Sequence, residues 1–299
     1  MKGIILAGGT GSRLYPLTRE TSKQLLPVYN KPMIYYPLAT LMLAKIKDIL
    51  IISSSSHIES FKSLLGDGSK IGINIQYATQ DKPDGIAQAF QIGESFIQDD
   101  SVCLMLGDNF LYGHMLPEIL VERKKKIEID GGASIFGYNV LNPENYGVAT
   151  VDGDKVVHIE EKPENPKSNW AVIGIYMYDN NVVNVSKKIK PSDRGELEIT
   201  SVNQAYLSTE NLSISLLGRG YTWFDTGNAE DLFTASSFVR TIEKRQGLKI
   251  ACLEEIAYYM GYITRDNLQD CADALKNTEY GTYLSNLVLR EDVFKYEQS

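Results

Sequence analysis

Residues 2–14, KGIILAGGTGSRL, join a short apolar run to a glycine-rich loop that contains an arginine. The run Lys2–Ala7 is typical of a buried strand, and the glycines that follow it indicate a tight turn at its end. Backbone N–H groups in such a loop can approach an anion closely, and the planar guanidinium of Arg13 suits phosphate oxygens. A tight turn carrying an exposed arginine is the alternative interpretation.

Two familiar phosphate-binding loops do not fit this segment. A P-loop ends in Gly-Lys followed by Ser or Thr, which is missing here, and a dinucleotide-binding fingerprint needs a third glycine where Leu14 stands. A plain NAD-binding domain is therefore disfavoured.

Strand-like and helix-like segments alternate over residues 1–140. Further buried strands are expected at 46–53, Ile73–Tyr77, Val102–Leu106 and Ala133–Tyr138, and helices at Tyr36–Ala44, Ile58–Leu65, Ile86–Phe96 and Leu116–Lys126. This alternation predicts a parallel, doubly wound sheet that is covered on both faces.

The second half of the chain has a different pattern. Val148–Val151 and Lys155–Glu160 flank an Asp-Gly turn, which predicts a β-hairpin, and Val172–Tyr178 is a further strand candidate. Helical periodicity dominates residues 229–247 and 254–289. The predicted fold class is α/β, with a mostly parallel, Rossmann-like sheet, an inserted antiparallel layer and a C-terminal helical extension.

Composition excludes several classes of protein. The net charge of -8 disfavours a nucleic-acid partner, which usually meets a basic face. No apolar run approaches the ~18 residues that a membrane span needs, so no membrane partner is expected. Three cysteines without CxxC spacing, Cys103, Cys252 and Cys271, are expected to be reduced thiols, and the protein is expected in the cytoplasm.

The motifs of residues 8–27 carry a family resemblance. They read G-G-x-G-S-R-L-x-P-L-T and then S-K-Q-L-L-P, which resembles the signature of the sugar nucleotidyltransferases. Longer stretches, among them PKSNWAV at 166–172, PSDRGELEIT at 191–200 and GRGYTWFDTG at 218–227, resemble the members that act on dTTP and glucose 1-phosphate.

The resemblance implies the reaction, the cofactor and the domain organisation. Such enzymes join dTTP to glucose 1-phosphate with Mg²⁺, giving dTDP-glucose and pyrophosphate at the start of dTDP-L-rhamnose and deoxysugar synthesis. It implies a catalytic domain at 1–250, with a nucleotide-binding part at 1–140 and a sugar-binding part at 141–228, followed by the extension at 251–299. The longer form of these enzymes is a homotetramer, a dimer of dimers.

Two aspartates are the candidate metal ligands. Asp108 follows the apolar run 102–106, and Asp225 follows Trp223-Phe224. Ligands of open α/β sheets lie beyond the carboxyl ends of strands, and two carboxylates with phosphate oxygens suit a hard octahedral cation. A helix cap or an Asx turn is the alternative for either residue. The resemblance implies that both bind the metal.

The resemblance also implies the residues on the nucleotide side. A glutamine amide can pair with a pyrimidine edge, although Gln80 could instead belong to a capped helix start. The catalytic set on this side is Arg13, Lys23 and Asp108. The nucleotide-binding set is Leu6, Gly8, Gly9, Thr10, Gly11, Arg13, Gln24, Gln80, Gly85 and Asp108.

The sugar-phosphate side is expected around the hairpin. The implied set is Tyr146, Gly147, Glu161, Lys162, Val172 and Arg194, in which Lys162 completes the catalytic set. Glu161 can accept from sugar hydroxyls, and Lys162 and Arg194 can meet the phosphate. The alternatives are a solvated charge run for residues 160–163 and an acidic helix start for residues 194–200.

Three alternatives stay open. A uridylyltransferase would use UTP, and a pocket distinguishes one methyl group by only ~1–3 kcal/mol. A non-catalytic nucleotide-sugar sensor would have the same fold. The apolar residues of 254–289 predict either simple burial or, through the resemblance, a subunit interface beside a second, regulatory nucleotide site that includes residues 111–114.

Overall fold

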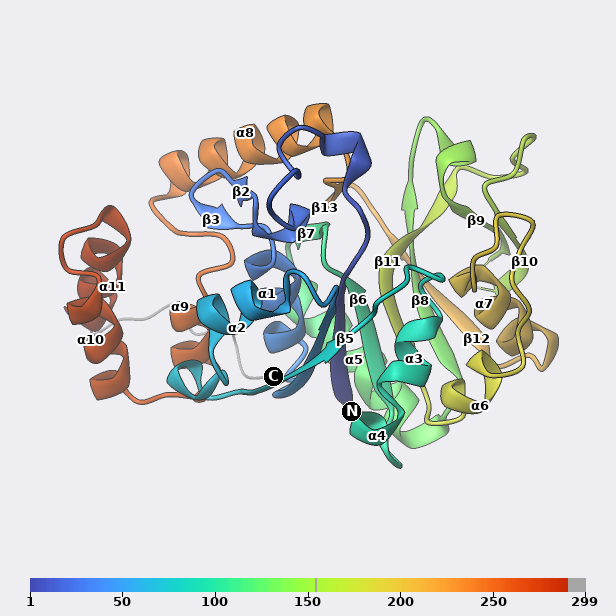
Figure 1. Ribbon diagram of the computed structural model, residues 1–299, viewed down its shortest axis with the longest axis horizontal. Helices are drawn as coiled ribbons and strands as arrows, with labels where there is room; N and C mark the ends of the chain where they lie inside the picture. Colours follow the sequence, from blue (N-terminus) through green and yellow to red (C-terminus); the bar gives the residue numbers. More distant parts are fainter. Residues whose placement is uncertain (154, 290–299) are drawn as a thin grey trace.

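The computed structural model describes residues 1–153 and 155–289, and over these ranges it contains one central nine-stranded sheet (Figure 1). The strand order is β5-β4-β1-β6-β11-β8-β12-β10-β9. Two short sheets, β13-β7 and β2-β3, lie beside it. The α/β fold class expected from the sequence is confirmed.

The parallel part of the sheet is the part that the sequence pattern describes best. Its strands are β1 (Lys2–Ala7), β4 (Asp48–Ser53), β5 (Asn74–Thr79) and β6 (Val102–Leu106), and β1 lies between β4 and β6. Alternate residues of these strands enter two different cores. Ile5 packs into one core and Ile4 into the other, and both are fully buried. Burial on both faces explains why β1, β4 and β6 are almost continuously apolar, whereas β5, at the edge of the sheet, carries exposed polar residues.

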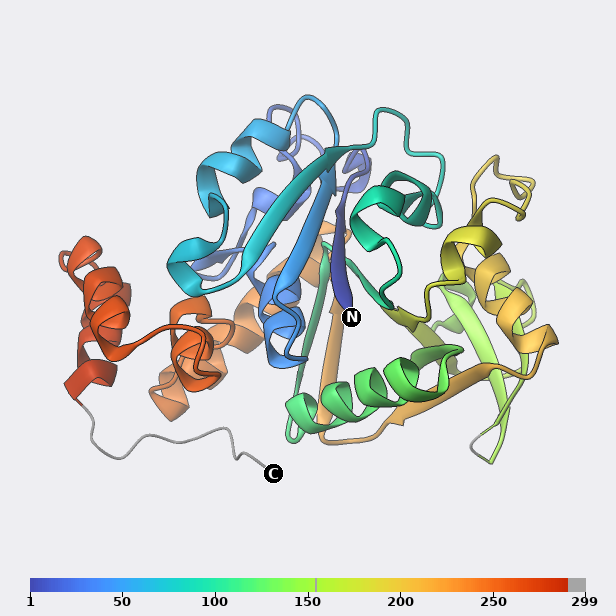
Figure 2. The ribbon, with the colours of Figure 1, turned by 90° about the horizontal axis from the view of Figure 1, so that it is seen from below.

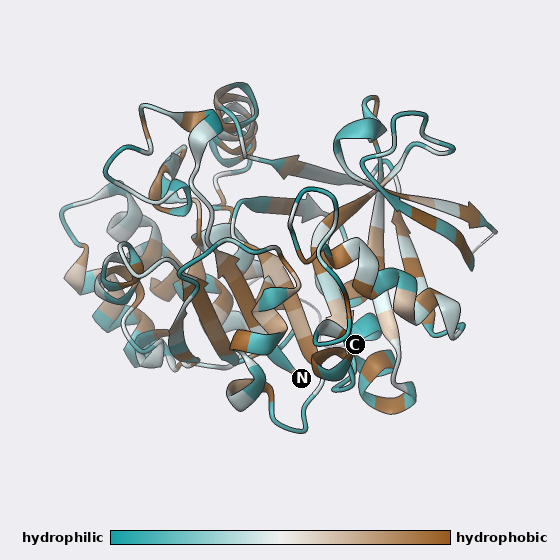
Figure 3. Cartoon of the chain, turned by 45° about the vertical axis from the view of Figure 1, so that its right-hand side comes forward, coloured by the Kyte–Doolittle hydropathy of each residue, from teal (hydrophilic) through white to brown (hydrophobic). Residues whose placement is uncertain are grey.

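Helices cover both faces. One core includes residues of α1 (Tyr35–Leu43) and α5 (Leu116–Asp130). The other includes residues of α3 (Gln88–Ile92), α4 (Glu94–Ile97), α6 (Val182–Ser186) and α7 (Ile199–Ser208). Helix α2 (Ile58–Leu65) packs beside β5. Figure 3 shows the apolar strands and the polar loops around them.

One expected helix is divided. The sequence predicted a continuous helix at Ile86–Phe96, whereas the chain turns at Gly93 between α3 and α4. A Cβ atom on Gly93 would lie 2.9 Å from Ile4 Cδ1, so the glycine allows this turn to pack tightly on the sheet. The prediction of one helix was wrong because it considered only local periodicity.

The antiparallel strands continue the same sheet. Strand β11 (Trp170–Tyr178) pairs with β6 and with β8 (Ala133–Asn139), and β12 (Leu212–Leu217) lies beside β8. The expected hairpin is present as β9 (Gly147–Asp152) and β10 (Lys155–Glu161) at the sheet edge. Strand β12, which the sequence analysis did not identify, connects this hairpin to the central strands.

Two small antiparallel pairs were also not expected from the sequence. Strand β7 (Asn109–Gly113) pairs with β13 (Tyr221–Asp225), and β2 (Pro27–Val28) pairs with β3 (Lys31–Pro32). Short 3-10 turns are found at Ser12–Leu14, Lys23–Leu25, Ser69–Ile71 and Pro143–Asn145.

The C-terminal part is helical, as the sequence predicted. Its helices are α8 (Ala229–Gln246), α9 (Leu253–Tyr259), α10 (Arg265–Ala274) and α11 (Glu279–Leu289). Helix α9 packs on α1, and Figure 2 shows the α10–α11 pair, in red, at one end of the body. Ile256, Leu268 and Ala272 are buried, whereas Leu275 is 37% exposed. The part of the predicted extension at 290–299 lies outside the described residues.

None of the helices at 1–153 and 155–289 is both long enough and apolar enough to span a lipid bilayer.

Candidate active site

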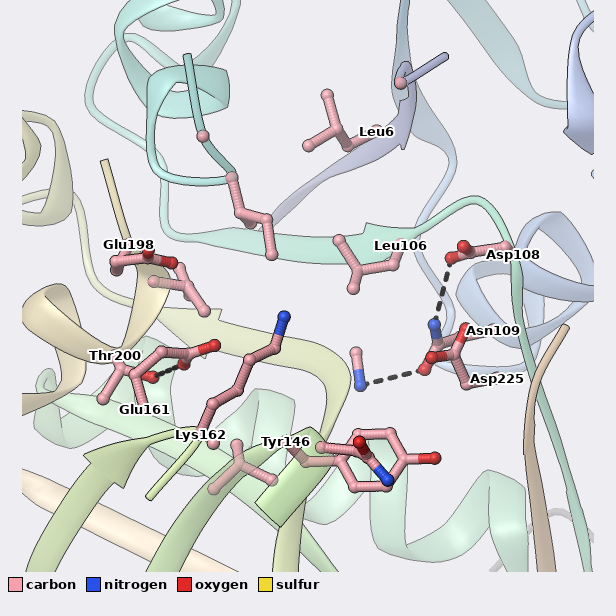
Figure 4. A pocket seen from close by; sticks show the side chains of 18 of the residues that line it. Leu6, Leu106, Asp108, Asn109, Tyr146, Glu161, Lys162, Glu198, Thr200 and Asp225 are labelled. Carbon is pink, nitrogen blue, oxygen red and sulfur yellow. Dashed lines mark hydrogen bonds between the residues drawn. The ribbon is translucent and has the colours of Figure 1, made fainter. Parts of the chain in front are cut away.

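A cavity of about 890 Å³ lies where the carboxyl ends of the parallel strands face the hairpin β9–β10 (Figure 4). The structure brings residues predicted for both substrates to its wall. These are Leu6, Gly8, Gly9, Arg13, Lys23, Gln24, Gln80, Gly85, Asp108, Tyr146, Gly147, Glu161, Lys162, Val172, Arg194 and Asp225. Thr10 and Gly11, which were also predicted, shape the glycine loop but do not line the cavity.

The glycine loop leaves β1 and presents Arg13. Gly11 has a φ of 61°, a value that favours glycine, and its carbonyl accepts a hydrogen bond of 2.8 Å from Thr18 Oγ1. Arg13 is exposed, and a Cβ atom on Gly227 would lie 2.7 Å from its Nη2 atom. Within the described residues no acceptor is hydrogen-bonded to the guanidinium, so its donors are free for an anion.

The side chain of Gln24 is hydrogen-bonded to the backbone of this loop. Its side chain is buried, its Oε1 accepts from Ser22 Oγ at 2.5 Å, and its Nε2 donates to the Gly8 carbonyl at 3.2 Å. The carbonyl end of the amide is therefore occupied by the protein itself. A direct contact of Gln24 with the nucleobase stays a prediction.

Asp108 lies at the end of β6 and pairs with Lys23. Burial alone would raise the pKa of Asp108, but the Lys23 ammonium and hydrogen bonds from Lys23 and Asn109 together hold it below its usual value. The Asp108 carbonyl also accepts from the backbone N–H and the hydroxyl of Thr226, at 3.1 and 2.6 Å. These bonds connect the end of β6 to the residue that follows Asp225.

Asp225 reaches the same place from a distant part of the chain. In the β7–β13 pair it stands opposite Asn109, the neighbour of Asp108. Burial and then the charge of Asp108 raise the pKa of Asp225 to about 6, against the opposing effects of Lys23 and Arg13. Burial of the Asp225 carboxylate and the neighbouring charge of Asp108 thus outweigh the stabilising effect of Lys23 and Arg13 on its ionised form.

The side chain of Asn109 links Asp108 to Gly174 and Trp223 by hydrogen bonds. The sequence analysis did not assign this role to Asn109. Its Oδ1 accepts from the Gly174 N–H at 3.0 Å and from Trp223 Nε1 at 2.7 Å, while its Nδ2 donates to Asp108 Oδ1 at 3.1 Å (Figure 4). A Cβ atom on Gly174 would lie 2.6 Å from Asn109 Oδ1. The signal in the sequence was the asparagine directly after the candidate metal ligand.

The opposite wall carries Glu161 and Lys162 at the end of β10. Glu161 accepts a hydrogen bond from Thr200 Oγ1, and burial raises its pKa although that bond opposes the shift. Lys162 has a φ of 43°, an unfavourable backbone conformation for a residue with a side chain. Figure 4 shows its ammonium group projecting into the middle of the cavity. Gly147 leaves space beside Glu161 and Thr200.

Arg194 is surrounded by carboxylates. Its Nη2 atom lies 2.8 Å from Glu198 Oε1, 3.4 Å from Glu196 Oε2 and 3.6 Å from Glu161 Oε1. Hydrogen bonding to Glu198 raises its pKa. Helix α7 begins directly after these acidic residues, at Ile199. A phosphate bound by Arg194 would have to compete with these carboxylates, and its role as a phosphate contact stays a prediction.

Several aromatic residues of the wall were not identified from the sequence. Tyr138, Tyr176 and Trp223 line the cavity, and the Tyr146 ring meets the Trp223 ring edge-on at 5.1 Å. Aromatic side chains offer an apolar face with few rotatable bonds. Tyr138, Tyr176 and Trp223 lie in strands β8, β11 and β13, and nothing in the sequence of these strands distinguishes residues that line a cavity from residues of an ordinary strand.

Comparisons with known proteins agree with this arrangement. The chain matches the model of the nucleotidyl transferase family over residues 2–242. A glucose-1-phosphate thymidylyltransferase from Neisseria meningitidis is 54% identical over 289 residues, covering 96% of this chain and 99% of the relative. One from Mycolicibacterium smegmatis is 52% identical over 292 residues, covering 97% and 100%. A Bacillus anthracis crystal structure assigned to the same enzyme and solved with a sucrose is 43% identical, with a TM-score of 0.74, covering 80% of this chain and 95% of that one.

Proposed function

The chain belongs to the nucleotidyl transferase family, and on that premise we propose that it joins dTTP to glucose 1-phosphate, giving dTDP-glucose and pyrophosphate. One observation carries the proposal. A single cavity has an arginine-bearing glycine loop and two carboxylates on one side, and a carboxylate–hydroxyl pair with Lys162 on the other. Two anions, one of which is a sugar phosphate, can therefore bind side by side.

The chemistry proposed for this cavity is an in-line displacement. A phosphate oxygen of glucose 1-phosphate forms a bond to the α-phosphorus of dTTP, and the bond from that phosphorus to the pyrophosphate oxygen breaks. No general base is needed, because the attacking phosphate is already ionised near neutral pH. The protein has to position two repelling anions and stabilise the charge that develops on the leaving group.

The cationic side chains would divide this work. Arg13, whose guanidinium is free, would meet the leaving pyrophosphate. Lys23, which is paired with Asp108, would lie beside the triphosphate. Lys162 would hold the phosphate of the sugar from the opposite wall. The positive φ of Lys162 supports a functional role, since strained backbone conformations are often found at active sites.

Asp108 and Asp225 fit Mg²⁺ as its protein ligands. Both are carboxylates at the cavity wall, and the pKa of Asp225 is raised first by burial and then by the neighbouring Asp108 carboxylate, an effect that a bound cation would oppose. Over residues 1–153 and 155–289 no cluster of three or more His, Cys, Asp or Glu forms a complete metal cage. Mg²⁺ is commonly held by one or two carboxylates together with phosphates and water. The chemistry that Mg²⁺ supplies when bound is charge neutralisation and orientation of the triphosphate.

The polar groups at the end of β10 suit a hexose. Glu161 can accept from sugar hydroxyls, and Thr200 holds its carboxylate in place. The absence of a side chain at Gly147 lets the backbone approach the ring.

Initial rates of pyrophosphate release with each pair of nucleotide and sugar phosphate test the proposal. We expect dTTP with glucose 1-phosphate to give a kcat/KM at or near the highest value. UTP is the instructive competitor, because uracil differs from thymine by one methyl group. A clear preference for ATP or for mannose 1-phosphate, or tight nucleotide binding without any turnover, would show that the proposal is wrong.

Three further properties are proposed from the resemblance to the relatives. They are assembly as a homotetramer, a role at the start of dTDP-L-rhamnose synthesis, and a second nucleotide site that lowers activity when the end product binds. Residues 111–114 of that predicted site lie in and just after β7, away from the wall of the main cavity. The apolar residues of α9 and α10 are mostly buried in the chain's own core, which supports simple burial at least as well.

A further inference from the structure

We propose that Asp84 and Gln88 fix the orientation of the Gln80 amide, and that this orientation makes the cavity select a base with an N–H donor, such as thymine, over cytosine. Gln80 lines the cavity, whereas Asp84 and Gln88 do not. The inference rests on the proposed function only in assuming that Gln80 faces the nucleobase. We call the three residues the Asp84–Gln88–Gln80 relay.

The orientation follows from Asp84, whose carboxylate can only accept hydrogen bonds. Gln88 lies 3.1 Å from Asp84 Oδ2, so it must turn its Nε2 toward that carboxylate. The Oε1 of Gln88 consequently points the other way, where it accepts from Gln80 Nε2 at 2.6 Å. The carbonyl of Gly85, a second obligate acceptor, also faces Gln80 Nε2 at 3.4 Å.

Gln80 is therefore left with its carbonyl oxygen available. That Oε1 atom lies 2.8 Å from where a Cβ atom of Gly8 would stand, so the missing side chain of Gly8 lets the oxygen approach the glycine loop. In the chain described at 1–153 and 155–289, no donor is hydrogen-bonded to Gln80 Oε1. The side chain is mostly buried, at 7% exposure, so its amide is held rather than free to rotate in solvent.

An available acceptor suits some bases and not others. Thymine and uracil carry an N–H at ring position 3, which can donate to Gln80 Oε1. Cytosine carries an unprotonated nitrogen at that position, so the two lone pairs would face each other. The relay consequently disfavours cytosine but leaves the choice between thymine and uracil to the contact with the methyl group.

Without the relay, only the longer contact of 3.4 Å with the Gly85 carbonyl would oppose rotation of the Gln80 amide. The two orientations of a glutamine amide have nearly the same shape, and only hydrogen bonding distinguishes them. The relay therefore contributes a preference of the order of one hydrogen bond, which corresponds to a factor of about ten. The backbone bond from Leu197 N–H to the Asp84 carbonyl, at 2.7 Å, does not depend on the Asp84 side chain, so the loop can keep its place when that side chain is changed.

The decisive variant is Asp84→Lys, because an ammonium group can only donate. It should turn Gln88 around, which turns Gln80 around and presents Nε2 to the cavity. Calorimetry gives the dissociation constants for dTTP and dCTP, and the readout is the Kd for dCTP divided by the Kd for dTTP. A general effect of the new charge on triphosphate binding changes both constants equally and therefore cancels in this ratio. We expect the preference for dTTP over dCTP to fall by about tenfold or more.

Two further variants complete the design. Asp81→Lys introduces the same charge in the same exposed loop, outside the relay, and should leave the ratio unchanged. Gln88→Leu removes the link and should lower the ratio mainly by weakening dTTP. A wild-type protein that binds both nucleotides equally, or an unchanged ratio in both Asp84→Lys and Gln88→Leu, overturns the relay.

The measurement separates this inference from the proposed function. Binding constants require no turnover. If the chain makes no dTDP-glucose but the ratio responds as expected, the proposed function is wrong and the relay stands. If turnover is normal and the ratio does not respond, the relay is wrong and the proposed function stands.

Discussion

Replacement of Glu243 by glutamine should destabilise the protein strongly, because Glu243 neutralises a buried lysine. Its Oε1 lies 2.7 Å from Lys31 Nζ and accepts from the Ile250 N–H at 3.0 Å, and its Oε2 accepts from Asn30 at 2.9 Å. The side chains of Lys31 and Glu243 are only 2% and 6% exposed. The pair connects the hairpin β2–β3 to α8. This hairpin follows in sequence the 3-10 turn that contains Lys23.

The magnitude follows from this burial. Glutamine keeps the shape and one acceptor oxygen but leaves the Lys31 ammonium without a counter-charge. Breaking one partner of a buried pair costs about 3–5 kcal/mol. At about 2–4 °C per kcal/mol for a large domain, the melting temperature should fall by about 10 °C.

The loss should also depend on pH in a defined direction. Burial already lowers the pKa of Lys31, while Glu243 opposes that shift. In Glu243→Gln the pKa of Lys31 falls further, whereas the unfolded chain keeps a lysine pKa of about 10.4. Between the two values the unfolded state binds more protons, so stability rises with pH in that window. The difference from wild type should therefore be smaller at alkaline pH than at neutral pH.

Urea unfolding at fixed protein concentration measures both effects. Glu59→Gln is the matched control, because Glu59 also lies 2.7 Å from a lysine, Lys62, but the two side chains are 77% and 46% exposed. This control should cost less than about 1 kcal/mol. The double variant Lys31→Met/Glu243→Met should recover part of the loss, since it removes both charges of the pair, but it also takes the Glu243 carboxylate from Lys249 and from the Ile250 N–H. Equal effects of Glu243→Gln and Glu59→Gln would refute the reasoning.

Three other predictions concern activity. Arg13→Ala should lower kcat by about 10²-fold without changing the free energy of unfolding, because this side chain is exposed and would act on the leaving group; a change confined to the KM for dTTP would contradict that role. Asp108→Asn and Asp225→Asn should each lower kcat by orders of magnitude and weaken Mg²⁺ binding in calorimetry; normal Mg²⁺ binding in both would show that the carboxylates are structural. Inhibition by dTDP-L-rhamnose should not be purely competitive with dTTP in steady-state kinetics; a purely competitive pattern would exclude a second site.

The parallel half of the fold could be predicted because its signal is local. Strands β1, β4 and β6 are short runs that are apolar on both faces, and the glycine loop follows β1 directly in sequence. Ile4 and Ile5 belong to different cores, so neither face leaves a polar residue to interrupt the pattern. Sequence reasoning therefore located β1 and β6 with the bounds that they have in the structure.

The strands that were missed have weaker local signals. Strand β12 contains Ser213 and Ser215 between its apolar residues, which weakens its apolar pattern. Strand β7 follows a motif that was interpreted for its aspartate alone. The division between α3 and α4 depends on how close Gly93 lies to Ile4, which is a tertiary contact and has no counterpart in periodicity.

In the site, too, the position of one metal-ligand candidate follows from the local sequence, and the position of the other depends on a long-range contact. Asp108 ends a buried strand, so its place at the edge of the sheet follows from the sequence. Asp225 reaches it only through the β7–β13 pair, in which Phe224 stacks on Phe110 at 5.5 Å and Asp225 stands opposite Asn109. Hydrophobic packing of the two rings thus fixes the register, and a slip by one residue would turn Asp225 to the other face. The contact between Phe110 and Phe224 therefore both stabilises this small sheet and brings the two carboxylates into one cavity. Residue types and their spacing along the chain do not reveal this contact, so the sequence alone could not predict it.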